Sequence, residues 1–133
     1  MRHVISRTLA LFAILGFAAG ALAAGDFPPQ TSSQSGVTVK VTPRNLAGAE
    51  WEFEVVFDTH SGELKDDLLK AAILVADGGK PWSPTGWQGD GPGGHHRKGV
   101  LRFKSPLPQP KEIALQIARP GESAPRSFRW SLR

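Results

Sequence analysis

Apolar and polar residues alternate along most of the chain from residue 37 onward, a pattern typical of β-strands with one buried face. A first strand is expected at 37–41. A second is expected at 50–57, where alternate apolar positions run from Trp51 to Phe57 between glutamates. Further strands are expected at 70–76, 80–87, 99–104, 113–117 and 128–132. Strands of this kind belong to antiparallel sheets that have one solvated face.

Turn signals separate these strands at roughly ten-residue intervals. Asp77-Gly78-Gly79, the prolines of 106–110 and the segment 119–126 are the clearest of them. The segment 61–69 is expected to form a single helical turn or an irregular crossover. About seven short strands with almost no helix predict an all-β fold, a single immunoglobulin-like or fibronectin-like antiparallel β-sandwich over 37–133. A small barrel is the alternative.

The N-terminal residues have the order of a secretory signal peptide. Basic Arg2 and Arg7 precede an apolar run, Leu9–Ala19, and small residues follow at Ala21-Leu22-Ala23. This run has about 11 residues, short of the roughly 20 that a membrane-spanning helix needs. We therefore predict a signal peptide at 1–23, cleaved near Ala23, and a periplasmic or secreted protein without membrane insertion after cleavage; an uncleaved anchor is the alternative.

Composition narrows the possible stabilising features and partners. Residues 24–36 are rich in Pro, Ser, Gln and Gly, so we expect a flexible leader before the sandwich. The chain has no cysteine, which excludes disulfides and thiolate metal sites. Loss of Arg2 and Arg7 with the signal peptide lowers the formal net charge from +4 to +2. This charge is too small to indicate a nucleic-acid partner.

Three histidines of the expected domain lie near strand ends. His60 follows the strand at 50–57, and His95 and His96 lie in the glycine-rich loop that follows the strand at 80–87. If the first of these strands ends at one pole of the sandwich, the next strand leaves this pole and the strand at 80–87 returns to it. We therefore expect all three imidazoles at one pole. The turn at 119–126 should reach the same pole.

A divalent transition-metal site is the first functional hypothesis for this pole. Imidazole is a preferred ligand of Cu(II) and Zn(II) where thiolates are missing. We predict a site formed by His60, His95 and His96. Asp58 is the expected carboxylate ligand, and Asp90 is a second nearby carboxylate. Neighbouring residues of an extended chain point to opposite faces, so His95 and His96 bind one ion only if the loop bends between them.

A structural role is the alternative for the three histidines, with imidazoles that hydrogen-bond loop backbone or stack on tryptophan. The protein would then be a structural or interaction module that contacts protein or glycan through Trp82 and Trp87, or through a sheet edge. The two tryptophans could instead cover the edge of the core. No complete catalytic signature is present in the sequence, so we predict a non-enzymatic binding module.

Several segments of the chain form a recognisable set: Asp58-Thr59-His60-Ser61, Trp87, Pro92-Gly93-Gly94-His95-His96-Arg97, Gly99-Val100-Leu101-Arg102-Phe103 and Phe128-Arg129-Trp130-Ser131-Leu132. Together they resemble a family of small uncharacterised prokaryotic secreted or membrane-anchored domains. The resemblance spans roughly 37–133 and implies a compact β-sandwich with no established activity. In architecture alone, a periplasmic β-sandwich with histidines at one pole is similar to copper-resistance carrier proteins. Met1 is the only methionine, so the thioether ligands for Cu(I) are missing.

Overall fold

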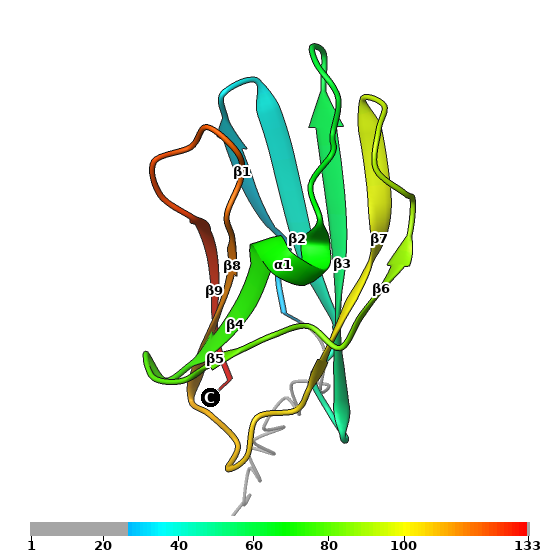
Figure 1. The fold of residues 1–133 in the computed structure, drawn as a ribbon. Helices are drawn as coiled ribbons and strands as arrows, with labels where there is room; N and C mark the ends of the chain where they lie inside the picture. The colour runs from blue at the N-terminus through cyan, green and yellow to red at the C-terminus, as the bar shows by residue number, and fades with distance from the viewer. Residues whose placement is uncertain (1–26, 133) are drawn as a thin grey trace, which may run out of the picture.

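Two antiparallel sheets face each other in the computed structural model, which describes residues 27–132 (Figure 1). The larger sheet has the order β1 (Gln30–Gln34), β2 (Val37–Asn45), β3 (Glu50–Thr59), β7 (His96–Lys104) and β6 (Gly86–Gly89). The smaller sheet has the order β5 (Pro81–Trp82), β4 (Ala72–Ala76), β8 (Glu112–Ile117) and β9 (Arg126–Ser131). The predicted signal peptide, 1–23, lies outside the described residues.

The strand order is that of an immunoglobulin-like sandwich. In that fold, strands A, B, E and D form one sheet and strands C, F and G form the other, with C′ beside C in some members. Strands β2, β3, β7 and β6 occupy the places of A, B, E and D, and β5, β4, β8 and β9 those of C′, C, F and G. The predicted all-β sandwich is therefore confirmed, and β1 is an additional strand beside β2.

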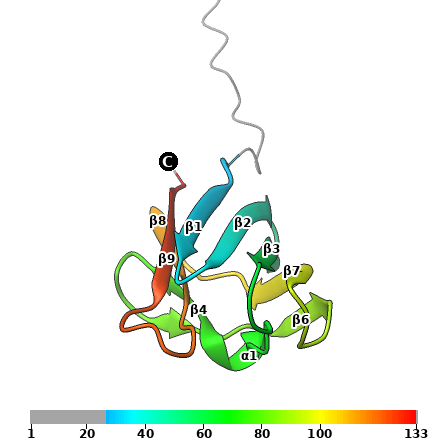
Figure 2. The same ribbon diagram turned by 90° about the horizontal axis from the view of Figure 1, so that it is seen from above.

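The core fills the space between the sheets and consists of the inward residues of both (Figure 2). Phe53 lies at its centre, with its ring edge-on to Phe103 at 5.8 Å between centroids and tilted against Trp130 at the same separation. Aromatic pairs in these geometries add about 0.5–1.5 kcal/mol beyond the area they bury. The alternation in the sequence thus sets which residues enter the core.

One segment between the sheets is helical. The chain leaves β3 through an irregular stretch and forms one turn of helix, α1 (Leu68–Ala71), before β4. The Asp67 side chain caps this turn by accepting a hydrogen bond from the Leu69 amide at 3.1 Å. Leu68 and Leu64 are buried in the core. Helix α1 lies at the side of the sandwich, in contact with β4 and β6 (Figure 2).

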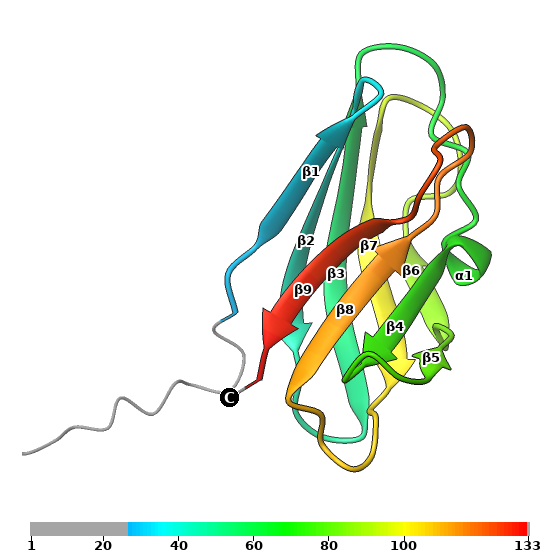
Figure 3. The ribbon, with the colours of Figure 1, turned by 90° about the vertical axis from the view of Figure 1, so that its left-hand side faces the viewer.

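The opposite side of the sandwich is closed by side chains. Strands β1 and β9 lie beside each other there but do not form a backbone ladder (Figure 3). The Gln30 side-chain amide donates to the Arg129 carbonyl, and its oxygen accepts from the Arg129 amide at 2.9 Å. The Trp130 indole donates to the Pro28 carbonyl at 2.8 Å. The N-terminal segment therefore bridges the two sheets.

Two boundaries differ from the sequence prediction. Five residues of the segment predicted as a flexible leader at 24–36 form β1, which pairs with β2 from Gln30↔Val41 to Gln34↔Val37. The polar composition of β1 is explained by its position, since an edge strand outside the sandwich proper needs no apolar face. The predicted strand at 80–87 is two strands in different sheets, because the chain crosses from β5 to β6 after Pro84.

Candidate functional site

Four loops meet at one end of the sandwich, which we call the loop pole (Figure 1). They are the β1–β2 turn and the connections β3–β4, β6–β7 and β8–β9. Backbone hydrogen bonds join two of them: Thr59 N to His95 O at 2.9 Å and Leu64 N to Gly94 O at 3.0 Å. Asp58 pairs with His96 in the β3–β7 ladder. The prediction that the loops carrying His60, His95 and His96 share one pole is thus confirmed.

The histidine side chains themselves do not converge. His96 Nδ1 lies 2.5 Å from Asp58 Oδ1, and both side chains are more than half exposed. His95 is exposed and contributes its carbonyl oxygen to the β3 end. His60 is exposed and forms no hydrogen bond or ion pair within residues 27–132. Of these three imidazoles, that of His96 alone has a carboxylate partner within residues 27–132.

The metal-ligand set predicted from the sequence is not assembled in this arrangement. Among the described residues, no three histidine, aspartate or glutamate side chains lie where they could hold one ion. The reason is local: β7 begins at His96, so the chain is already extended there and neighbouring side chains point to opposite faces. Asp90, the second carboxylate considered, accepts a hydrogen bond from the Lys98 amide at 2.9 Å.

A buried ion network occupies the interior of the loop pole. Arg119 forms a two-point pair with the Asp66 carboxylate, at 3.0 and 3.1 Å. Arg126 pairs with both oxygens of the Glu122 carboxylate, at 2.9 and 2.8 Å. Arg119 also reaches Glu122 at 3.4 Å and so links the two pairs. These side chains are at most 9% exposed, so the network is part of the protein interior.

Arg126 also holds the N-terminal hairpin. Its guanidinium donates to the carbonyl oxygens of Ser32 at 3.0 Å, Gln34 at 2.8 Å and Val37 at 2.8 Å. Together with the Glu122 pair, these bonds use all the guanidinium nitrogens of a side chain that is 1% exposed. A buried charge needs such partners, because the desolvation cost is offset only by good geometry and further hydrogen bonds. Arg126 therefore fastens β1 and β2 to β9.

The same bonds perturb one carboxyl group. The hydrogen bond from Arg126 lowers the pKa of Glu122 from its ordinary value, and the positive charges of Arg126 and Arg119 lower it further. Burial raises this pKa and is the second-largest influence, after the hydrogen bond from Arg126, but the net shift is downward. Glu122 is accordingly held as a carboxylate at neutral pH.

Arg97 is a third arginine with a buried side chain at this pole. It is 3% exposed, donates to the carbonyl oxygens of Asp66 and Asp90, and lies 5.5 Å from the centroid of the Trp87 ring. The Trp87 indole donates to the Asp90 carbonyl at 3.0 Å. Trp87 and Trp82 are both half-buried and pack against the core. They cover the edge of the core, and contact with a protein or glycan through them stays a prediction.

The buried arginines were not identified from the sequence, although a signal was present. Arg97 lies in phase with the inward residues Leu101 and Phe103 on β7, and Arg126 lies in phase with Phe128 and Trp130 on β9. The alternation thus assigns both to the inner face. An arginine at an inward position near a strand end indicates a buried charge with loop carbonyls as partners.

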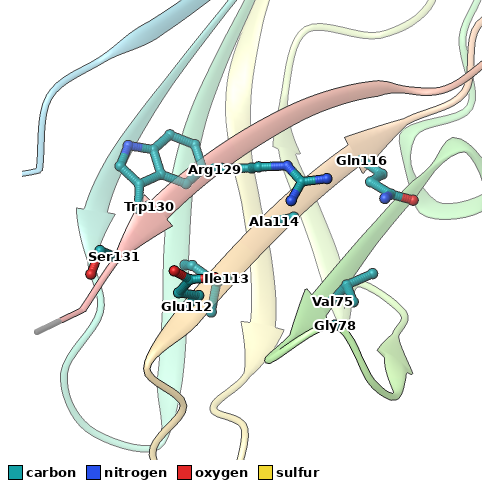
Figure 4. Close-up of a pocket in the computed structure, with 9 residues that line it drawn as sticks. All are labelled: Val75, Gly78, Glu112, Ile113, Ala114, Gln116, Arg129, Trp130 and Ser131. Carbon is teal, nitrogen blue, oxygen red and sulfur yellow. The ribbon is translucent and has the colours of Figure 1, made fainter.

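A second feature lies on the outer face of the smaller sheet. A hollow of about 430 Å³ is centred on Ala114 of β8 (Figure 4). Val75 and Ala114 supply its apolar floor, and the polar side chains around it are Glu112, Gln116, Arg129 and Ser131. In Figure 4 the Arg129 guanidinium extends over Ala114. Neither Arg129 nor Glu112 forms a salt bridge within the part of the chain that the structure describes.

The outer face of the larger sheet is different, because most of its charged side chains pair with one another. Glu54 of β3 pairs with Arg44 and lies 3.8 Å from Lys98. Arg102 of β7 pairs with Glu50 at 3.1 Å and Glu52 at 3.2 Å. Cross-strand pairs of this type stabilise a solvated sheet face. The two outer faces thus differ: one has mostly paired charges, and the other has a hollow beside which Arg129 and Glu112 have no ion-pair partner among residues 27–132.

Comparisons with known proteins add no family or relative. No family model matches the chain, and comparisons with curated proteins and with solved structures return no match. The family resemblance of the PGGHHR segment therefore stays a prediction. No helix among residues 27–132 is long and apolar enough to cross a membrane. The class that the fold defines is an immunoglobulin-like β-sandwich.

Proposed function

We propose that this protein is an exported, non-enzymatic interaction module that contacts a protein partner, in the periplasm or outside the cell. The contact surface is the outer face of the smaller sheet. The single observation that carries the proposal is the hollow centred on Ala114, with Arg129 and Glu112 beside an apolar floor. Protein contacts combine such an apolar centre with surrounding polar groups.

The loop pole supports this proposal because its buried polar groups form hydrogen bonds with the backbone of its own loops. The Thr59 hydroxyl lies within hydrogen-bond distance of two carbonyl oxygens, Gly36 O and Ser61 O. Arg97 and Arg126 are engaged with backbone carbonyls. Groups with these partners fasten loops to one another. The pole accordingly serves as the structural support of the sandwich, and the partner surface lies on the sheet.

Site-specific photocrosslinking tests the partner surface. A photoreactive residue at Gln116, which lines the hollow beside Ala114, should give a covalent adduct with a discrete protein in the organism that encodes the chain. The matched control is the same residue at Val56, which is half-buried on the outer face of the larger sheet. Adducts at both positions alike, or at neither, would contradict a contact surface on the smaller sheet.

Intact-mass measurement tests the export step. The exported protein should begin at or next to Ala24, because the small residues Ala21 and Ala23 fit a signal-peptidase site. Replacing Ala23 with a bulky charged residue should retain the full-length mass. A full-length mass for the unmodified exported protein would show an uncleaved anchor instead.

Binding of a divalent transition metal at the loop pole is the second candidate function. The observation in its favour is the short contact between His96 and Asp58, with His60 and His95 on loops joined to the same strand ends. Cu(II) and Zn(II) titrations of the mature domain test it. Binding tighter than about 100 μM, equivalent to roughly 5.5 kcal/mol, that is lost in His60→Ala and in His96→Ala would support a site. Weaker binding, or binding unaffected by both changes, would exclude it.

A further inference from the structure

We infer that the partner of the smaller sheet's outer face is a second copy of this chain, which packs on it face to face as a two-fold symmetric dimer. This inference rests on the proposed function, because it names the occupant of the same hollow. It begins from the two charged side chains beside Ala114 that have opposite signs and no ion-pair partner in the described residues.

The positions of these charges make the face complementary to itself. Ala114 pairs with Arg129 and Glu112 pairs with Ser131 in the β8–β9 ladder, so Arg129 and Glu112 are diagonal neighbours on adjacent strands. A two-fold axis that runs parallel to the sheet between them brings each Arg129 opposite the other copy's Glu112. In such an interface, one contact implies its reciprocal contact. One pair of residues therefore gives two intermolecular salt bridges.

The hollow supplies the space that this packing requires. Arg129 is exposed, and its side chain lies above the apolar floor at Ala114 (Figure 4). An arginine stem packs on apolar surface while its planar guanidinium meets a carboxylate. Ala114 is the smallest side chain at the centre of the face, and a larger one would fill the space that the partner's arginine needs. In the dimer, Ala114 thus packs on the partner's arginine stem, and Arg129 and Glu112 each meet the opposite charge of the second copy.

Other partner chemistries fit this face less well. A glycan is recognised largely by exposed aromatic rings, and Trp130, the aromatic residue beside the hollow, is 4% exposed with its indole bonded to Pro28. An anionic partner would be repelled by Glu112, and a cationic partner by Arg129. A surface with one unpaired charge of each sign is matched by a partner with the same two charges, which a second copy provides.

Sedimentation velocity over a series of concentrations provides the first test. The mature protein should form a dimer at micromolar concentrations, and the dimer should weaken between about 50 mM and about 500 mM salt because screening reduces the exposed part of the charge pairs. Ala114→Arg should leave a monomer whose unfolding midpoint equals that of the wild-type protein diluted until it is monomeric. A wild-type protein that is monomeric at every concentration would overturn the inference.

Charge exchange provides the decisive test. Arg129→Glu alone and Glu112→Arg alone should each weaken dimerisation at least about tenfold, because like charges then face each other. An equimolar mixture of these two variants should form a heterodimer, since every facing pair is again opposite in sign. The double variant R129E/E112R should form a homodimer for the same reason. Lys40→Glu, a charge reversal at an exposed site on the larger sheet, is the matched control and should change nothing.

The outcomes separate this inference from the proposed function. A dimer that ignores both charge reversals would show that the copies meet elsewhere, and the inference fails. A monomer whose position 116 crosslinks to a different protein would contradict the second copy but retain the interaction module. A monomer with no adduct at position 116 would overturn both.

Discussion

At the scale of single residues, buried arginines determine how this cysteine-free domain holds its loops. Arg126 and Arg97 each bind backbone carbonyls from segments that are distant in sequence. Arg119 joins Asp66 to Glu122. A guanidinium has five donors in a fixed planar arrangement, so one side chain can satisfy several carbonyls that no strand ladder reaches. These residues thus provide fixed connections between loops, a role that disulfides serve in many small exported domains.

Replacement of Arg126 tests this role. Arg126→Ala should lower the free energy of unfolding by about 3–5 kcal/mol, because Glu122 and three carbonyls lose a buried partner. Arg44→Ala, which removes the exposed partner of Glu54, should cost less than about 1 kcal/mol. Urea denaturation followed by tryptophan fluorescence measures both. Arg126→Lys keeps the charge but not the planar geometry, so its stability should fall between wild type and Arg126→Ala. Equal losses for Arg126→Ala and Arg44→Ala would contradict a buried anchor.

The pKa of Glu122 predicts a pH dependence. Because this pKa is lower in the folded protein than in the unfolded chain, ionised Glu122 stabilises the fold fully above the unfolded value of about 4.3. The contribution is lost as pH falls through the lower folded-state pKa. The stability difference between wild type and Glu122→Gln should therefore be constant from neutral pH to about 5 and then shrink on further acidification. Urea unfolding at a series of pH values measures it, and a pH-independent difference would contradict the ion pair.

At the scale of elements, β6 is held in place because a large side chain of β6 packs on a glycine of β7. Gly99 of β7 lies directly under the Trp87 ring, and an added Cβ would come within 2.5 Å of the ring atom Cζ2. The indole therefore occupies the volume that any other residue at 99 would need. This contact, with Arg97 on the same ring, fixes β6 against β7.

Gly99→Ala tests this packing. The change should cost about 1–3 kcal/mol by overpacking and should alter the fluorescence of Trp87. Gly86→Ala is the control within β6, since nothing lies within 4 Å of an added Cβ there and the backbone angle is ordinary for any residue. Its unfolding free energy should change by less than about 0.5 kcal/mol. A Gly99→Ala protein as stable as wild type would show that the ring is free to move aside.

The elements also show what the sequence could predict. Alternation identified the inward faces of β2, β3, β7, β8 and β9, and strand counting correctly brought His60 and His95 to one pole. Alternation did not identify β1, because this strand lacks an apolar face. It is held by pairing with β2 and by contacts from Arg126. The candidate site was less predictable, because loop conformation directs each imidazole. The hollow at Ala114 was also not found, since it depends on how two adjacent strands place their outward side chains.

At the scale of the whole molecule, the folded domain includes β1 and so begins before residue 37, where the alternation of apolar residues starts. A protein that starts at residue 37 should be about 3 kcal/mol or more less stable than one that starts at residue 27, because it lacks β1 and the Ser32 and Gln34 carbonyls. Starting at residue 27 rather than 24 should leave the unfolding midpoint unchanged. Thermal unfolding of the three proteins measures this. Equal stability of the proteins that start at residues 37 and 24 would show that residues 24–36 are a dispensable leader, as the sequence predicted.

The Gln30 side chain has a consequence for how copies of this molecule can assemble. Its amide occupies both backbone groups of Arg129, so this position on β9 offers neither a donor nor an acceptor to an approaching strand. Exposed strand edges are the usual route by which β-proteins polymerise into ribbons. Because these groups are occupied, addition of a strand to β9 at Arg129 is disfavoured, whereas face-to-face pairing does not need them. Assembly by a two-fold axis uses up the contact surface of both copies and stops at two.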